Sequence, residues 1–180
     1  LTTIHNMKRG CKMERIAPDG LPEAVTEVTA ELAAKVLRAD GSVEDKGVVS
    51  RKIVSTAFLT ELTNAMRATG ASVTRIQNYK YHAWGTSTAS ENAGHNDVQT
   101  AASPTDLPGT RVTGTQAGSA NTYVSVATIT AGGTLAITEH CISPDLISSS
   151  YGLDRSLFPA INVNSGDSIQ FTYTLTLTGS

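Results

Sequence analysis

The residues with the strongest potential for chemistry are Glu139, His140 and Cys141, which place a carboxylate, an imidazole and a thiol next to one another. A catalytic cysteine needs a base within hydrogen-bond reach. Neighbouring side chains on a strand point to opposite faces, so His140 cannot readily activate Cys141, and His82 or His95 would have to act as a remote base. The commonest role of a free cysteine is that of a small buried side chain. We therefore predict that Cys141 is structural.

A second candidate site is the acidic stretch that follows residue 39, which faintly resembles a calcium loop. Its oxygen-bearing residues at alternating spacing are Asp40, Ser42, Glu44 and Asp45. The sixth-position glycine and the terminal bidentate glutamate of a calcium loop are missing. The pair Asp40-Gly41 is a turn signal that needs no metal. We predict a turn here, and no metal site.

The remaining polar residues add no further pattern for a site. The histidines, which lack metal-ligand spacing and are expected to be hydrogen-bonded or at the surface, are His5, His82, His95 and His140. Gly132-Gly133 leads into no helix and so forms no phosphate loop. Asp154 and Arg155 are expected to form a solvated local ion pair, which contributes little. No catalytic, cofactor-binding or metal residue is predicted, and the chain is interpreted as non-enzymatic.

Composition and charge limit the class of protein. Hydrophobic residues make up 39% of the 180 residues and charged residues 17%, and frequent Thr and Ser suit strands with one apolar and one hydroxylated face. The net charge of −2 gives no basic surface for phosphates, so protein partners are expected and nucleic acid is not. No stretch reaches the roughly 18 apolar residues of a membrane span. We expect a soluble protein made in a cytoplasm, with Cys11 and Cys141 reduced.

The N-terminal part of the chain predicts an arm followed by a hairpin. Residues 1–20 carry basic groups without apolar periodicity, so they are predicted to extend outside the core. Apolar residues at three- and four-residue steps from Leu21 predict a short helix over about residues 22–31. Beyond it, residues 33–39 and 47–55 are interpreted as two strands joined at the Asp40-Gly41 turn, although the helical spacing itself continues to Val36.

The middle of the chain predicts a helix, a strand and a long loop. Residues 56–68 place apolar side chains on one helical stripe, and Ser55 or Thr56 is able to cap its start. Residues 73–84 alternate as in a strand, with Tyr79, Tyr81 and Ala83 on one face. Residues 85–107 are small and polar and predict an ordered surface loop or a partner-facing excursion.

The rest of the chain predicts strands at regular spacing. These cover residues 109–116, 120–130, 133–142 and 155–163, and a last strand starts at Asp167. In the last strand Ile169, Phe171 and Tyr173 alternate with hydroxyl residues, which predicts a central strand with one core face. The fold class is therefore mainly β: residues 21–180 form one antiparallel, jelly-roll-like β-sandwich with one or two short helices.

Five segments, in this order, resemble a group of tailed-phage virion proteins over about residues 48–178. The segments are residues 79–88 (YKYHAWGTST), 111–115 (RVTGT), 137–140 (ITEH), 153–158 (LDRSLF) and 164–173 (NSGDSIQFTY). In that group a "KYH..GTGT" strand and loop precede an "R-V-x-G" strand, a "T-E-H-G" strand and a final "N-x-G-D-x-I-Q-x-x-Y" strand. This chain differs in having Ser87 for a loop glycine and Cys141 for the glycine after the histidine.

The resemblance implies a particle component of the kind that cements or decorates capsids. We expect a structural virion protein, assembled in the cytoplasm of a bacterial host, that binds the major capsid protein or another virion protein. A homo-oligomer is expected, and a trimer would suit a local threefold position. The alternatives are a tail or head-to-tail connector component and a carbohydrate-binding β-sandwich, although few aromatics remain for sugar stacking. Residues 1–20 and 85–107 lack the apolar content to be held by their own domain, so both are expected to contact other subunits.

Overall fold

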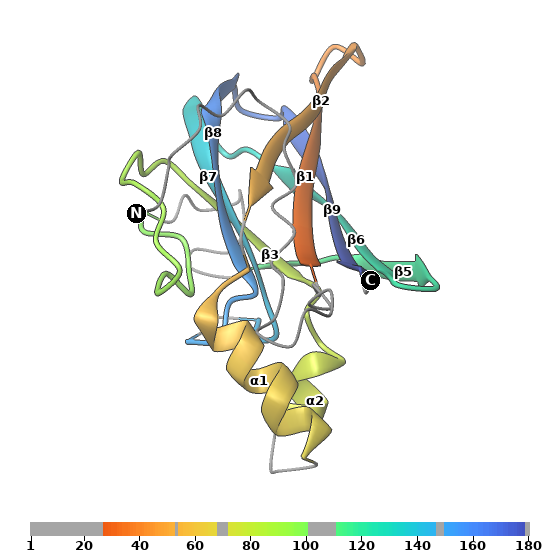
Figure 1. Ribbon diagram of the computed structural model, residues 1–180. Coiled ribbons are helices and arrows are strands. Elements are labelled where there is room, and N and C mark those ends of the chain that lie inside the picture. The colour runs from red at the N-terminus through yellow and green to blue at the C-terminus, as the bar shows by residue number, and fades with distance from the viewer. Residues whose placement is uncertain (1–26, 53, 68–71, 101–110, 147–149, 179–180) are drawn as a thin grey trace, which may run out of the picture.

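The computed structural model describes residues 27–52, 54–67, 72–100, 111–146 and 150–178 and shows two antiparallel β-sheets packed face to face (Figure 1). The larger sheet has the order β2-β1-β9-β6-β5 and the smaller one β4-β3-β7-β8. The strands are β1 (Glu27–Leu37), β2 (Val43–Lys52), β3 (Tyr81–Gly85), β4 (Val112–Thr113), β5 (Thr115–Ser119), β6 (Thr122–Thr130), β7 (Leu135–Ser143), β8 (Asp154–Val163) and β9 (Ser168–Thr178). The predicted mainly β, antiparallel sandwich is confirmed, and the predicted arm at residues 1–20 lies outside the described residues.

Strand β9 lies at the centre of the larger sheet, between β1 and β6. Its inward residues Ile169, Phe171 and Tyr173 are fully buried, whereas the alternating threonines are partly exposed. In the core Phe171 packs edge-on against Trp84, with ring centroids 6.5 Å apart. The prediction of a central last strand with one core face is therefore confirmed.

Strand β1 begins where a helix was predicted. Its first residue, Glu27, pairs with Thr178 of β9, so the predicted helix over residues 22–31 is wrong for residues 27–31. The inward face of β1 carries Val28, Ala30, Leu32, Ala34 and Val36, which alternate as a strand requires. Two of these residues are alanines, so the large apolar residues alone fell at helical steps. The predicted hairpin of β1 and β2 is confirmed, with Gly41 at φ 87° in its turn.

Two helices, α1 (Thr56–Met66) and α2 (Ser72–Ile76), lie together at one end of the sandwich (Figure 1). The first matches the predicted helix, and the Ser55 side chain caps it by accepting a hydrogen bond from the Phe58 amide. The second overturns the first half of the strand predicted over residues 73–84. Arg75 of α2 donates to the buried Glu61 of α1 at 3.0 Å, so tertiary contacts override the β-branched pattern. Neither described helix is long and apolar enough to cross a bilayer.

The chain passes from the smaller to the larger sheet at Gly114, between β4 and β5. The Gly114 amide donates to the Lys80 carbonyl at 2.7 Å. A Cβ at this position would lie 2.8 Å from both His82 Nε2 and Ser125 Oγ, which is closer than packed atoms approach. The strand predicted over residues 109–116 is therefore divided, and only a glycine fits where it changes sheets.

Candidate functional site

A hydrogen-bonded chain of three polar side chains crosses the core between the two sheets. His140 Nε2 lies 2.9 Å from His82 Nδ1, and His82 Nε2 lies 2.8 Å from Ser125 Oγ. A serine beside a histidine is the usual pair of nucleophile and base. Ser125 and His82 have no exposed surface and His140 is 1% exposed, so no substrate reaches the serine in this conformation.

The two histidines of this hydrogen-bonded series, His82 and His140, are neutral at pH 7. Burial lowers the pKa of His82 to about 3, and burial together with the neighbouring His82 charge lowers the pKa of His140 well below its usual value. A neutral imidazole has one N–H donor and one nitrogen acceptor. One donor and one acceptor are what His82 needs for its two hydrogen bonds, to His140 and to Ser125. The three side chains therefore link the two sheets across the core, which agrees with the predicted hydrogen-bonding role of the histidines.

Cys141 lies on the other face of β7 from His140. Its Sγ is 3.6 Å from the Ile142 carbonyl and 4.0 Å from the Asn96 carbonyl, and the side chain has no exposed surface. Burial raises the pKa of the thiol well above its usual value, so it is protonated at neutral pH. The prediction of a small buried Cys141 is confirmed, with its neighbour His140 directed into the core.

The two remote bases that could have served Cys141 are bonded elsewhere. His82 bonds to His140 and Ser125, and His95 Nδ1 lies 3.2 Å from Arg155 Nη1. Because arginine only donates, His95 accepts at Nδ1. Neither histidine is thus placed as a partner of the thiol.

The most extensive polar cluster is centred on Glu139 of β7 and Arg155 of β8. Arg155 Nε donates to Glu139 Oε2 at 2.7 Å, and the two side chains are 1% and 0% exposed. The expected solvated pair of Asp154 and Arg155 is therefore wrong. Adjacent residues on a strand face opposite ways, so Arg155 meets Glu139 across the strands, whereas Asp154 faces the core and accepts from Ser156 Oγ at 3.1 Å.

Residues 86–100 cover the outer face of the smaller sheet and are fastened to this cluster. Glu139 Oε1 accepts from the Thr100 amide at 2.8 Å and the Ser87 amide at 3.2 Å, and Oε2 accepts from the Gln99 amide at 3.0 Å. Arg155 Nη1 donates to the Ala89 carbonyl at 3.0 Å. Charge-assisted hydrogen bonds, in place of apolar contacts, thus hold this loop on the sheet.

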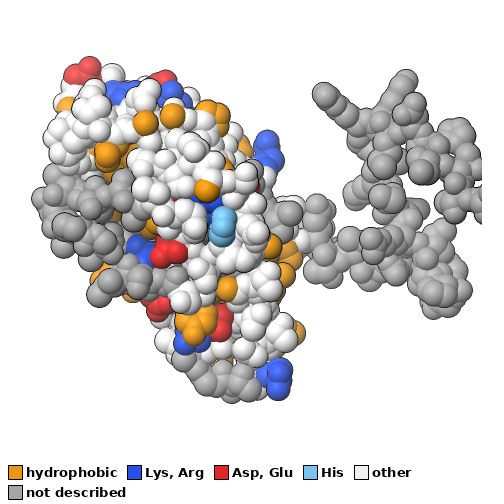
Figure 2. All heavy atoms as spheres, turned by 90° about the vertical axis from the view of Figure 1, so that its left-hand side faces the viewer, with side chains coloured by type: hydrophobic (Ala, Val, Ile, Leu, Met, Phe, Trp, Pro, Cys, Tyr) orange, Lys and Arg blue, Asp and Glu red, His pale blue; other side chains and the backbone are white. Residues whose placement is uncertain are grey.

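This arrangement corrects the expectation for residues 85–107. Residues 85–100 have few apolar side chains, yet hydrogen bonds to Glu139 and Arg155 hold them on their own domain. Residues 101–107 lie outside the described part. Figure 2 shows the face that includes this loop as mostly uncharged, with scattered hydrophobic side chains and few charged ones. The prediction of an ordered surface loop is therefore confirmed for the described portion.

Two glycines allow the loop to approach the sheet so closely. A Cβ on Gly152 would lie 2.7 Å from the carbonyl carbon of Asn96, and a Cβ on Gly85 would lie 2.9 Å from Glu139 Cδ. The Gly152 amide also donates to the Asn96 carbonyl at 3.0 Å. Gly85 and Gly152 are the only signal in the sequence for this close contact between loop and sheet, and the sequence analysis did not recognise it.

The acidic stretch after residue 39 forms turns and ion pairs. Asp40 Oδ1 accepts from the Ser42 amide at 2.8 Å, as in an Asx turn. Glu44 pairs with Arg38 at 3.0 Å, and Asp45 pairs with Lys35 at 3.4 Å. These carboxylates therefore point to different partners, and the prediction of a turn at Asp40-Gly41 is confirmed.

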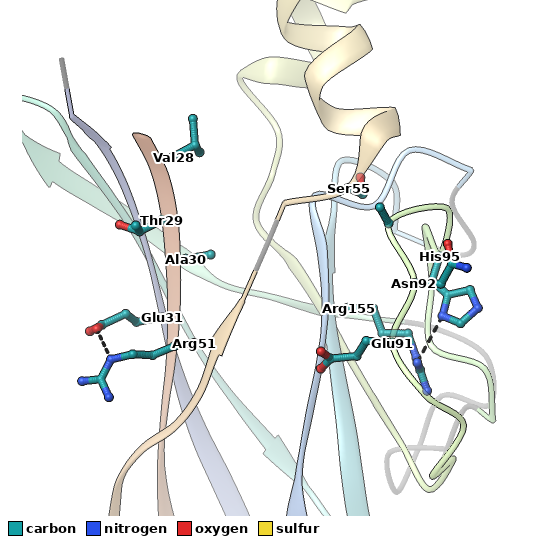
Figure 3. Close-up of a pocket in the computed structure, with 11 residues that line it drawn as sticks. Val28, Thr29, Ala30, Glu31, Arg51, Ser55, Glu91, Asn92, His95 and Arg155 are labelled. Atoms are coloured by element: carbon teal, nitrogen blue, oxygen red, sulfur yellow. Dashed lines mark hydrogen bonds and ion pairs between the residues drawn. The ribbon is translucent and has the colours of Figure 1, made fainter. Parts of the chain in front are cut away.

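A hollow of about 650 Å³ lies between the start of β1, the end of β2 and the loop after β3 (Figure 3). Its walls are formed by Val28, Thr29, Ala30, Glu31, Arg51, Ser55, Glu91, Asn92, Ala93, His95 and Arg155. On one wall Arg51 pairs with Glu31 at 2.6 Å, and on the other Arg155 bonds to His95 (Figure 3). Among the described residues, the charged groups of both walls are bonded within the protein and none of them is a candidate nucleophile.

Comparison of the chain with protein-family models, with curated proteins and with solved structures finds no match. The structure by itself defines an antiparallel β-sandwich whose smaller sheet is covered by a hydrogen-bonded loop. The two nucleophiles considered, Ser125 and Cys141, have no exposed surface. In the described residues, the polar side chains of this candidate site mainly hold the fold together.

Proposed function

We propose that this chain is a structural protein of a tailed-phage particle, which it binds and stabilises as a capsid cement or decoration protein. The order of the five resembling segments supports the class, and the character of the molecular surface supports a binding role. The observation that carries the proposal is the outer face of the larger sheet, which is uncharged across β9, β6 and β5.

Over β9, β6 and β5 the outer face of the larger sheet consists of uncharged side chains, most of them hydroxyl or small apolar, whereas β1 and β2 add the charged Glu31, Lys35 and Arg51 at one side. Across β1, β9 and β6 four successive rows are Lys35, Gln170 and Thr128; Ala33, Thr172 and Val126; Glu31, Thr174 and Val124; and Thr29, Thr176 and Thr122. Low charge is typical of the centre of a protein interface. The two described helices lie at one end of the sandwich, away from this face (Figure 1).

Among the alternatives, a tail or head-to-tail connector component would use the same kind of surface. The carbohydrate-binding alternative receives less support, because sugar stacking needs exposed aromatic rings. Trp84 is 1% exposed, Tyr79 is 2% exposed, and Phe171 and Tyr173 are fully buried. The rings best suited to stacking therefore belong to the core.

The proposed partner is the major shell protein or another virion protein. Further copies of this chain are the next partner, and a trimer would suit a threefold position of a shell. Because residues 86–100 are fastened to their own sheet, they would offer a preformed surface and no ordering cost on binding. Residues 1–20 remain the second segment proposed to contribute to attachment.

The function can be tested on particles of the phage that encodes the chain. Antibodies raised against the purified protein should stain gradient-purified particles, and gold labelling should place it on the shell. Labelling at the tail or neck would favour the connector alternative, and absence from washed particles would refute the proposal.

Attachment can be tested separately with a variant that lacks residues 1–20. We expect circular dichroism to show an intact β-fold and co-sedimentation with particles to fall strongly. Full occupancy of the truncated protein would assign the interface to the sandwich faces, and the full-length chain is the matched control.

A further inference from the structure

The exposed edges of the two sheets differ in how they are protected against pairing with another strand. An edge strand presents unpaired backbone N–H and C=O groups, which form a template for strand addition. In the described structure the edges are β2 and β5 of the larger sheet and β4 and β8 of the smaller sheet. Proteins protect such edges with charges, prolines, bulges or very short strands.

Three of the four edges carry such a protection. Strand β2 presents Glu44, Asp45 and Lys46 and has two register shifts against β1. Strand β8 contains Pro159, which has no N–H to donate. Strand β4 is 2 residues long. Each of these edges is thus a poor template for a fifth or sixth strand.

Strand β5 has none of these devices. Its sequence, TQAGS, contains no charge and no proline, and all 5 residues are exposed. It pairs with β6 along its whole length and projects from the side of the molecule (Figure 1). The Gln116 side chain donates to the Gln77 carbonyl and to the Tyr123 hydroxyl, both at 3.1 Å. These bonds fasten β5 in an extended shape before any partner binds, which lowers the ordering cost of pairing.

We infer that the outer edge of β5 is a strand-pairing surface, and that its occupant is β5 of a second copy of this chain. The two strands run antiparallel about a twofold axis and join two larger sheets into one continuous sheet. A twofold contact must be complementary to itself. Pairing centred on Ala117 sets Thr115 opposite Ser119 and Gln116 opposite Gly118, so no like charges meet and no bulky side chains collide.

This inference goes beyond the proposed function and does not depend on where the chain sits in a particle. A contact of a few residues is small compared with stable interfaces, so the dimer is expected to be weak and concentration-dependent. It also differs from the trimer proposed for a threefold position, and the mass in solution distinguishes the two.

The test is sedimentation equilibrium of the full chain from about 5 to 500 µM, a range chosen for a weak interface. The expected result is a rise in mass from 18.8 kDa towards twice that value. Ala117→Lys sets two like charges opposite each other, and Ala117→Pro removes a backbone donor. Each should raise the concentration needed for dimerisation at least tenfold.

The matched control is Val48→Lys, which changes an exposed residue on the opposite edge strand, β2, and should leave dimerisation unchanged. Circular dichroism shows whether each variant is folded. If Ala117→Pro unfolds, Ala117→Lys decides, because residue 117 is exposed. A wild-type chain that stays monomeric or forms a trimer would overturn the inference. So would a folded Ala117→Lys variant that dimerises like the wild type, or a Val48→Lys variant that does not dimerise.

Discussion

Replacing Glu139 with glutamine should strongly destabilise the protein, because it removes the charge that compensates the buried Arg155. Glutamine has the same shape but keeps only one oxygen. If that oxygen continues to accept from the Ser87 and Thr100 amides, an NH2 group faces Gln99 N and Arg155 Nε, and these two donors lose their acceptor. The substitution therefore leaves a cation buried without its counter-charge.

The expected cost follows from the burial of the pair. Breaking a fully buried ion pair by removing one partner costs about 3–5 kcal/mol. Two buried donors that each lose an acceptor, at about 1–3 kcal/mol per donor, give a cost of similar size. We expect Glu139→Gln to lower the free energy of unfolding by about 4 kcal/mol. For a chain of 180 residues this corresponds to a fall in Tm of about 10 °C.

Urea unfolding followed by tryptophan fluorescence measures this cost, because Trp84 is the only tryptophan and is 1% exposed. Hydrogen exchange adds a local readout, and the amides of Gln99 and Thr100 should lose protection. The matched control is Glu31→Gln, which breaks an ion pair whose side chains are 43% and 70% exposed and should change stability by less than about 0.5 kcal/mol.

A double variant separates the effect of the unpaired charge of Arg155 from the effect of the lost hydrogen bond to the Gln99 amide. Adding Arg155→Met to Glu139→Gln removes the uncompensated cation and should recover part of the lost stability. The reasoning would be refuted if Glu139→Gln cost less than about 1 kcal/mol, the net value of an ordinary hydrogen bond, while the Gln99 and Thr100 amides kept their protection.

Four further outcomes are expected. The pKa of His82 is about 3 in the folded protein, compared with the ordinary histidine value of 6.5 that applies in the unfolded chain. Its stabilising contribution is therefore complete above pH 6.5 and falls by about 2 kcal/mol between pH 7 and pH 5 in urea titrations. The lowered pKa of His140 adds a fall of the same sign, so His82→Gln should reduce the dependence without removing it. An unchanged dependence would contradict the burial of a neutral His82. Ala120 has φ 51° in the β5–β6 turn, so Ala120→Gly should raise the free energy of unfolding by about 0.5–1 kcal/mol in the same assay, whereas a loss would contradict strain there. Phe171→Ala should cost about 3–5 kcal/mol in a thermal melt, and almost no loss would contradict its central position. Iodoacetamide should modify Cys141 in the folded protein far more slowly than in urea, and rapid labelling of Cys141 itself, distinguished from Cys11 by peptide mass, would revive a reactive thiol.

The sequence was most informative where large side chains alternate without interruption. Ile169, Phe171 and Tyr173 predicted both the extent and the central place of β9. It was misleading where the inward face of a strand is made of alanine, as in β1, because Ala30 and Ala34 carry little hydrophobic signal. It also failed at residues 72–76, where β-branched residues form a short helix that packs on α1 through Arg75.

The candidate site could be predicted residue by residue but not as an arrangement. The buried Cys141 and the hydrogen-bonding role of the histidines followed from residue type and strand geometry. The meeting of His82 with His140, and of Glu139 with Arg155, depends on the registers of β3, β7 and β8, which no local pattern specifies. The loop itself was predicted, but its attachment to the smaller sheet was missed, because the loop contributes mainly backbone amides, which are common to every sequence.

The position of β9 also has a consequence for the order in which the protein can be made. On the ribosome β9 emerges after the other eight described strands, yet it lies between β1 and β6, and Glu27 at the start of β1 pairs with Thr178 at its end. Until then the β1–β2 and β5–β6 hairpins have no shared sheet, and their apolar faces are uncovered. Pairing between segments so distant in sequence is slow, and uncovered edges at this stage favour aggregation. Soluble yield should therefore depend on how quickly β9 is completed and inserted, and a lower expression temperature or a chaperone that holds the incomplete chain should increase it.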